Sequence, residues 1–168
     1  MKRSTEELRT EDGIEAFLAF ANPILGVDMN DPYMRELYGT SRLVSDILEE
    51  ARAGFVIRDG GKIVAGLFTT ILDDRDKADR RISDSRTLAL TEYWAVAEDR
   101  RRQGLISTLI RASAAWARSR LAVELLAEIE LTNPPSLRTA FRNGFVATDL
   151  LPPGLGIPGE FLVLRKPL

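Results

Sequence analysis

A basic turn that contains a glycine lies between an apolar stretch and an amphipathic one, within residues 88–120. Three arginines, residues 100–102, precede Gly104, and apolar side chains then recur at helical spacing to residue 120. A helix that begins at Gly104 would offer the free N–H groups of its first turn, and the positive end of its dipole, to an anion. Glycine would also let the backbone approach a ligand closely. The turn predicts a phosphate or pyrophosphate site, and a solvated basic turn before a structural helix is the alternative.

Glu92 is the main candidate for proton transfer. The chain has no histidine and no cysteine, so near neutral pH a proton must move through a carboxylate, a tyrosine, a lysine, a terminus or water. Glu92 stands in the apolar stretch 88–96, where strand alternation predicts that its side chain shares a face with that of Val96. Desolvation there would make Glu92 a stronger base. A structural glutamate is the alternative, and Glu128 and Glu130 are weaker candidates.

The composition limits the class of protein. Hydrophobic residues make up 45% of the 168 residues, and the formal net charge is −2, so a bulk attraction to nucleic acid or to an anionic membrane is not expected. The absence of cysteine excludes disulfides and thiolate metal sites, and no metal site is expected. No run of about 18 apolar residues and no apolar N-terminal segment occurs. These features favour a cytoplasmic protein with neither a nucleic-acid nor a membrane partner.

The elements that would position these residues follow from apolar periodicity and turn signals. Leu8 belongs to a short first strand, and Asn22-Pro23 should end the first helix. The expected helices are 10–22, 33–38, 41–54, 104–120 and 133–143. The expected strands begin at 55, return over 63–72 after the turn 59–62, and continue as 88–96, 123–131, 145–150 and 160–165. Residues 73–86 are expected to form a long solvated loop.

This order of elements predicts one domain over residues 1–168, of the α/β (α+β) class, because no linker or internal repeat divides the chain. The central sheet should be mixed, mostly antiparallel and flanked by helices.

Two segments resemble the GNAT superfamily of N-acetyltransferases. They are AVAEDRRRQGLIS, residues 95–107, and NPPSLRTAFRNGF, residues 133–145. The signature of that family is Arg or Gln, any two residues, Gly, any residue, then Gly or Ala. The chain matches it over residues 101–105 and departs from it at Ile106. The resemblance implies the acyl-CoA N-acyltransferase fold and the transfer of an acetyl group from acetyl-CoA to a primary amine of a small molecule or peptide.

The resemblance also implies residue roles. Main-chain groups near Val96 would pair with the pantetheine arm and provide an oxyanion donor, and amides around Gly104 would hold the pyrophosphate. The full set of implied cofactor-binding residues is Trp94, Ala95, Val96, Arg101, Arg102, Gln103, Gly104, Leu105, Ile106, Ser107, Asn133 and Ser136. The acceptor would be chosen by the helices before residue 54 and by the loops 73–86 and 152–159. A homodimer is left open.

The general acid is not assigned by the resemblance. Many members of the family have a tyrosine four residues before the glycine of the second segment, and this chain has Ala140 there. Tyr93, Tyr38 or Tyr33 could serve instead, or water could protonate the leaving thiolate. The alternative function is a catalytically weak or inactive GNAT fold that binds an acyl-CoA or a protein partner.

Overall fold

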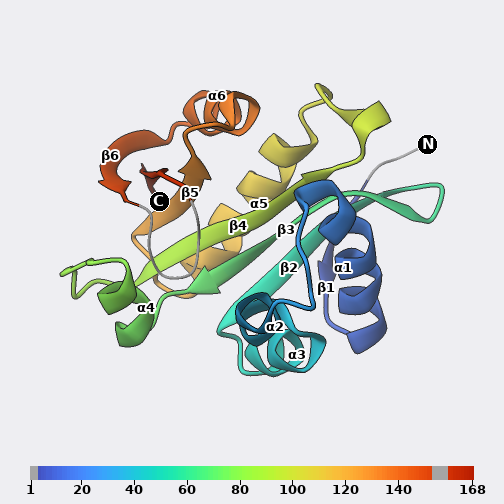
Figure 1. Cartoon of the computed structure of the whole chain (residues 1–168), viewed down its shortest axis with the longest axis horizontal. Helices are drawn as coiled ribbons and strands as arrows, with labels where there is room; N and C mark the ends of the chain where they lie inside the picture. Colours follow the sequence, from blue (N-terminus) through green and yellow to red (C-terminus); the bar gives the residue numbers. More distant parts are fainter. Residues whose placement is uncertain (1–3, 153–158) are drawn as a thin grey trace.

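Seven strands form one mixed sheet in the order β1-β2-β3-β4-β5-β7-β6 (Figure 1). The computed structural model describes residues 4–152 and 159–168, except for the side chain of Tyr33. The strands are β1 Thr5–Leu8, β2 Arg52–Asp59, β3 Lys62–Ile71, β4 Leu88–Val96, β5 Glu124–Glu130, β6 Val146–Leu151 and β7 Phe161–Pro167. Only β4 and β5 pair in parallel among the described strands, so the predicted mixed, mostly antiparallel α+β class is confirmed.

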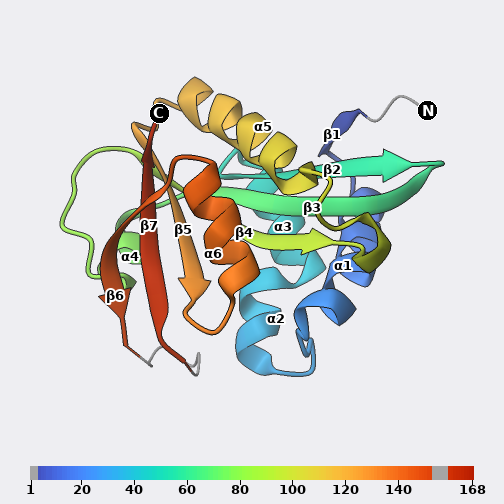
Figure 2. The same ribbon diagram turned by 90° about the horizontal axis from the view of Figure 1, so that it is seen from above.

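Helices cover both faces of this sheet. They are α1 Glu11–Leu25, α2 Pro32–Tyr38, α3 Thr40–Leu48, α4 Asp74–Asp79, the 3₁₀ turn η1 Glu98–Arg100, α5 Leu105–Ser119 and α6 Pro134–Arg142. One face packs on α1 and α3 through a core that includes Phe17, Leu43 and Phe68. The other face packs on α5 and α6 (Figure 2). None of the helices in the described part of the chain is long and apolar enough to span a membrane.

The first helix does not end at Asn22-Pro23, so that prediction is wrong. Helix α1 continues to Leu25, and Gly26 then adopts a left-handed conformation with its N–H bonded to the carbonyl oxygen of Asn22. A proline in the last turn removes one backbone donor. Packing of Ile24 against the core beneath α1 keeps the turn helical despite the preference of the residue before proline for an extended conformation.

The predicted end of the third helix near residue 54 is also wrong. Helix α3 ends at Leu48, and β2 begins at Arg52. The first six residues of β2 are buried because both faces of this strand are covered: Phe55 packs on the α5 side and Val56 on the α1 side. A strand buried on both faces has no polar alternation to mark its start.

Residues 73–86 are not simply a solvated loop. Asp73 and Asp76 form a capping box that begins α4, and Ile82 packs against a small core with Leu72 and Leu88. Lys77 is buried, and its Nζ donates to the carbonyl oxygen of Arg86 at 2.9 Å. The segment is therefore partly ordered by its own contacts and lies along one end of β4.

Candidate active site

Strands β4 and β5 separate in the middle of the sheet. They pair only where Leu88, Ala89 and Leu90 lie beside β5, opposite the stretch from Glu124 to Leu126. Beyond that point β4 continues along β3 as far as Val96, while β5 continues along β7. Figure 2 shows the two strands running in different directions, with α6 drawn between their ends. Within the described residues, the edge of β4 that faces the opening between the two strands has no strand partner after Leu90.

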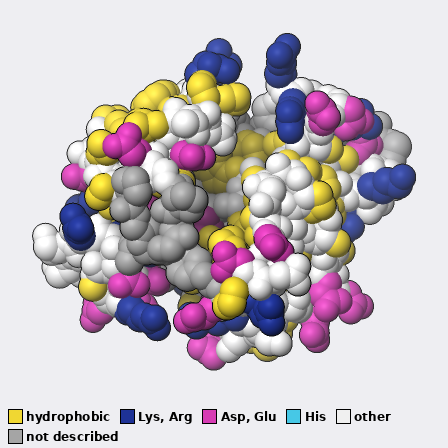
Figure 3. Space-filling model, viewed as in Figure 1, with side chains coloured by type: hydrophobic (Ala, Val, Ile, Leu, Met, Phe, Trp, Pro, Cys, Tyr) yellow, Lys and Arg dark blue, Asp and Glu magenta, His cyan; other side chains and the backbone are white. Residues whose placement is uncertain are grey.

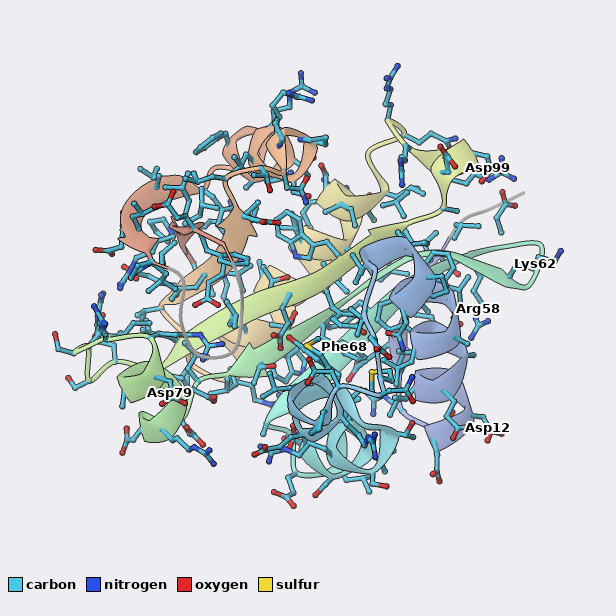
Figure 4. All side chains as sticks on the ribbon, in the orientation of Figure 1. Asp12, Arg58, Lys62, Phe68, Asp79 and Asp99 are labelled. Atoms are coloured by element: carbon cyan, nitrogen blue, oxygen red, sulfur yellow. The ribbon has the colours of Figure 1, made fainter. Side chains whose placement is uncertain are left out.

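A bulge interrupts β4 at the opening. Gly66 of β3 pairs with Ala95, and Phe68 pairs with Glu92, so two residues, Tyr93 and Trp94, lie opposite one residue of β3. Tyr93 has a positive φ of 63°, which is unusual for a residue other than glycine. The side chain of Tyr93 packs on the ring of Phe68, which Figure 4 places at the centre of the sheet.

The bulge reverses the alternation of side chains. Tyr93 and Ala95 face the α1 side, whereas Trp94 and Val96 face the α5 side. Glu92 faces the α2 and α3 side, where it contacts Tyr38. The prediction that Glu92 and Val96 share a face is therefore wrong, because one extra residue shifts the pattern by one position.

The main chain at the end of β4 points into the opening. The N–H of Ala97 donates to the carbonyl oxygen of Val64, on the β3 side, at 2.9 Å. Since successive residues direct their backbone groups to opposite edges of a strand, the N–H groups of Val96 and Trp94 are directed away from β3. These two groups are donors that an extended ligand in the opening can reach.

The turn before α5 presents a second set of main-chain donors. Gly104 caps α5 with φ of 73° and no side-chain hydrogen bond, so the first amides of α5, those of Leu105 and Ile106, have no intrahelical acceptor. A Cβ placed on Gly104 would meet no atom within 4 Å. Arg101 and Arg102 are exposed and make no ion pair with any residue of the described ranges. The two arginines add positive charge beside these amides.

The remaining predicted cofactor-binding residues lie around α6 and the start of α5. Ile106 is partly buried and packs on the core. Ser107 accepts a hydrogen bond from Nδ2 of Asn143 at 3.0 Å, which ties the end of α6 to the start of α5. Asn133 caps the other end of α6, where its Oδ1 accepts from the N–H of Ser136 at 3.2 Å. Asn133 and Asn143 therefore lie at opposite ends of α6, and the end that carries Asn143 is the one bonded to the start of α5.

Glu92 lies in a polar cluster rather than among apolar groups. Its Oε2 accepts from the hydroxyl of Tyr38 at 2.7 Å, and its Oε1 accepts from the hydroxyl of Thr70 at 2.8 Å. The guanidinium of Arg52 approaches Oε1 at 3.7 Å. Thr70 and Arg52 were not among the predicted site residues, because they lie 22 and 40 positions away from Glu92 and no local pattern connects them to it.

A cleft of about 1090 Å³ lies beside Glu92. Its walls come from α2 and α3 on one side and from α4, β5 and β7 on the other, and Figure 3 shows a hollow on this face. Glu128 of β5 also lines the cleft and pairs with Nε of Arg80 at 2.8 Å. Burial raises the pKa of Glu128 above its ordinary value despite this pairing. Glu128 is therefore a second candidate base, whereas Glu130 is not among the residues that line the cleft.

The two described tyrosine side chains already donate hydrogen bonds. Tyr38 donates to Glu92, and Tyr93 donates to Oδ1 of Asn22. Burial, together with the charge of Glu92, raises the pKa of both phenols, so both keep their protons. Ala140 is fully buried in the core between α6 and the sheet. Tyr33, the third candidate acid, has a side chain outside the described residues.

Comparisons with known proteins agree with this architecture. The profile of the acetyltransferase (GNAT) family matches residues 15–145, more than half of the chain. A GNAT-family acetyltransferase from Streptococcus pneumoniae is similar at 14% identity and a TM-score of 0.72, over 99% of this chain and 100% of that one. Ard1 from Thermoplasma volcanium is similar at 22% identity and a TM-score of 0.70, over 100% of this chain and 99% of that one.

PaiA N-acetyltransferase from Thermoplasma acidophilum, in a structure with coenzyme A, is similar at 12% identity and a TM-score of 0.70, over 98% of this chain and 99% of that one. A search of curated protein sequences finds no significant match. The structural likenesses are at low identity and show a shared fold, while the family profile identifies the relationship. The chain belongs to the acetyltransferase (GNAT) family.

Proposed function

We propose that the chain transfers the acetyl group of acetyl-CoA to a primary amine of a small molecule or peptide. The observation that carries this proposal is the opening beside β4: the unpaired part of this strand runs from Glu92, at the cleft, to Val96, just before the turn that leads to Gly104. The presence of coenzyme A in the similar structure of PaiA N-acetyltransferase supports the choice of co-substrate. A cytoplasmic location and a homodimer stay predictions from the sequence.

The residues around the opening fit a coenzyme A thioester. The amides between Arg101 and Ser107 would hold the pyrophosphate, since the turn is open, positively charged and without a side-chain cap. Trp94 and Val96 would pair with the pantetheine arm through their main chain, and Ala95 directs its main chain to β3 instead. The amide side chain of Asn133, with Ser136 beside it, would bind farther along the arm.

The proposed chemistry uses two groups of the chain, together with water. The amine nitrogen forms a bond to the thioester carbon, and Glu92 accepts the proton that the nitrogen loses, directly or through a water. The N–H of Val96 donates to the oxyanion that develops on the carbonyl oxygen. The C–S bond then breaks, and the thiolate takes its proton from water, because the hydroxyls of Tyr38 and Tyr93 donate elsewhere.

Calorimetry with acetyl-CoA, followed by a free-thiol assay over a panel of amines, tests the proposal. Acetyl-CoA should bind, and at least one amine should release coenzyme A. Glu92→Gln should lower kcat by about 100-fold or more, as expected for the loss of a general base, with acetyl-CoA affinity unchanged. If Glu128→Gln has that effect and Glu92→Gln does not, Glu128 is the base.

A second candidate is an acyl-CoA-binding module without turnover. The observation that favours it is the buried Ala140, which provides no acid where many relatives have a tyrosine. Tight binding of acetyl-CoA with no thiol release on any amine would support this module. Absence of binding would contradict both candidates.

A further inference from the structure

Tyr38 connects the wall of the acceptor cleft to the carboxylate on β4. It is the last residue of α2, it lines the cleft, and its hydroxyl donates to Oε2 of Glu92 at 2.7 Å. We propose that Tyr38 is a positioning residue for acetyl transfer, which together with Thr70 holds the Glu92 carboxylate in the orientation that meets the incoming amine. This inference rests on the proposed role of Glu92 as the base.

The two hydroxyls fix the carboxylate from both of its oxygens. Tyr38 binds Oε2, and Thr70 binds Oε1 at 2.8 Å. An ionised carboxylate has about four lone-pair sites; the guanidinium of Arg52 approaches Oε1 at 3.7 Å, so Oε2 is the oxygen that keeps a site for the amine. Two bonds to different oxygens prevent rotation of the carboxylate plane, and this site then points in a fixed direction. Such a base accepts a proton without first reorienting.

The aromatic ring of Tyr38 is held by contacts that do not involve its hydroxyl. The ring of Tyr93 lies at 4.6 Å between centroids, and the guanidinium of Arg52 lies 5.7 Å from the centroid of Tyr38. The backbone after Tyr38 is also fixed, because the N–H of Gly39 donates to the carbonyl oxygen of Arg35 at 2.9 Å. Removal of the hydroxyl alone therefore leaves the ring in place, and Tyr38→Phe isolates the hydrogen bond.

The hydroxyl of Tyr38 stays protonated at working pH. Burial, followed by the charge and the hydrogen bond of Glu92, raises the pKa of Tyr38 well above its ordinary value. Within the described residues, the charged and titratable groups that face this pair are Asp46 of α3, Arg52 of β2, Asp76 of α4, Arg80 directly after α4, Tyr93 of β4 and Glu128 of β5.

An absorbance titration of the phenols near 295 nm tests the contact without any substrate. The chain has three tyrosines, and Tyr38→Phe identifies the transition that belongs to Tyr38. Glu92→Gln should move that transition to lower pH by about one unit or more, because the negative charge that opposes ionisation is gone. Identical titrations of the native chain and the Glu92→Gln variant would overturn the proposal.

The separation of kcat from KM tests the effect on the reaction. Tyr38→Phe and Thr70→Val should each lower kcat by about tenfold and leave KM for acetyl-CoA unchanged, since each removes a hydrogen bond that orients the carboxylate. Thr69→Val is the matched control: Thr69 faces α5 and bonds to Ser113, so its variant should leave kcat unchanged.

The outcomes separate this inference from the function on which it rests. An unchanged kcat in Tyr38→Phe, with Glu92→Gln inactive, overturns the role of Tyr38 alone. Full activity of Glu92→Gln overturns both that role and the assignment of the base. A lower kcat at unchanged KM and unchanged Tm in Tyr38→Phe and in Thr70→Val, with the kcat of Thr69→Val unchanged, supports the inference, since a purely structural role would lower Tm or raise KM as well.

Discussion

Replacement of Gly104 by alanine should weaken acetyl-CoA binding by more than its effect on stability explains. Gly104 adopts φ of 73° at the start of α5, and an alanine in this left-handed conformation costs about 1–2 kcal/mol. In a chain of 168 residues this cost corresponds to a decrease in Tm of about 2–8 °C. The added Cβ meets no protein atom within 4 Å, so no further loss of stability is expected.

The same Cβ occupies the space through which the pyrophosphate would approach the amides. Loss of one hydrogen bond to a charged group costs about 1.5–3 kcal/mol, which corresponds to a decrease in acetyl-CoA affinity of about 10- to 150-fold. Thermal unfolding measures the decrease in Tm, and calorimetric titration with acetyl-CoA measures the decrease in affinity. The prediction is that Gly104→Ala lowers both the Tm and the affinity.

Gly61→Ala is the matched control for this experiment. Gly61 has φ of 81°, and a Cβ added to it would also meet no atom within 4 Å, so the backbone strain of its alanine variant is similar. It lies at the tip of the hairpin between β2 and β3, so its variant does not alter the amides of the turn before α5. The hairpin contacts that turn through the side chains of Asp59 and Arg100, which pair at 3.3 Å. Gly61→Ala should lower Tm and leave the affinity unchanged. Equal affinities of the two variants for acetyl-CoA would refute the placement of the pyrophosphate at Gly104.

Three further predictions concern buried groups. Ala140→Tyr should destabilise the chain by about 1–3 kcal/mol in urea unfolding, because Ala140 has no exposed surface and a ring would overpack the core. Burial raises the pKa of Glu128 in the native chain, so the native state binds this proton more tightly than the unfolded state. Urea midpoints should then fall as pH rises from the ordinary glutamate range towards the raised pKa, and Glu128→Gln should reduce that slope. Lys77→Ala, which removes the bond from Nζ to the carbonyl oxygen of Arg86, should speed tryptic cleavage after the exposed Arg81 by about threefold or more, measured on gels.

The parts of the fold that were predicted well have strong local signals. The limits of β4 were predicted to the residue, since an apolar run ends at a charged turn there. Helix α5 begins one residue after Gly104, and α6 begins after the cap residue Asn133. The hairpin was predicted from two adjacent glycines, and both have positive φ in the structure. Periodicity and capping are properties of neighbouring residues, so a single sequence reveals them.

The polar surroundings of Glu92 could not be predicted in this way. The hydroxyl of Tyr38 comes from 54 positions earlier and that of Thr70 from 22 positions earlier. Neither residue stands in a motif, and tyrosine and threonine are ordinary constituents of helix ends and strands. Only the three-dimensional arrangement of α2 and β3 around β4 brings these side chains together. The expectation of an apolar environment for Glu92 was therefore wrong for a non-local reason.

The bulge at Tyr93 has the largest consequence for the proposed chemistry. It places the side chains of Glu92 and Val96 on opposite faces of β4, but the N–H of Val96 lies in the plane of the sheet and is directed to the opening whichever face the side chain takes. The proposed oxyanion donor is therefore unaffected, whereas the proposed base is confined to the α2 and α3 face. The thioester carbon must then lie in the opening itself, with the amine approaching from the cleft that Tyr38 lines.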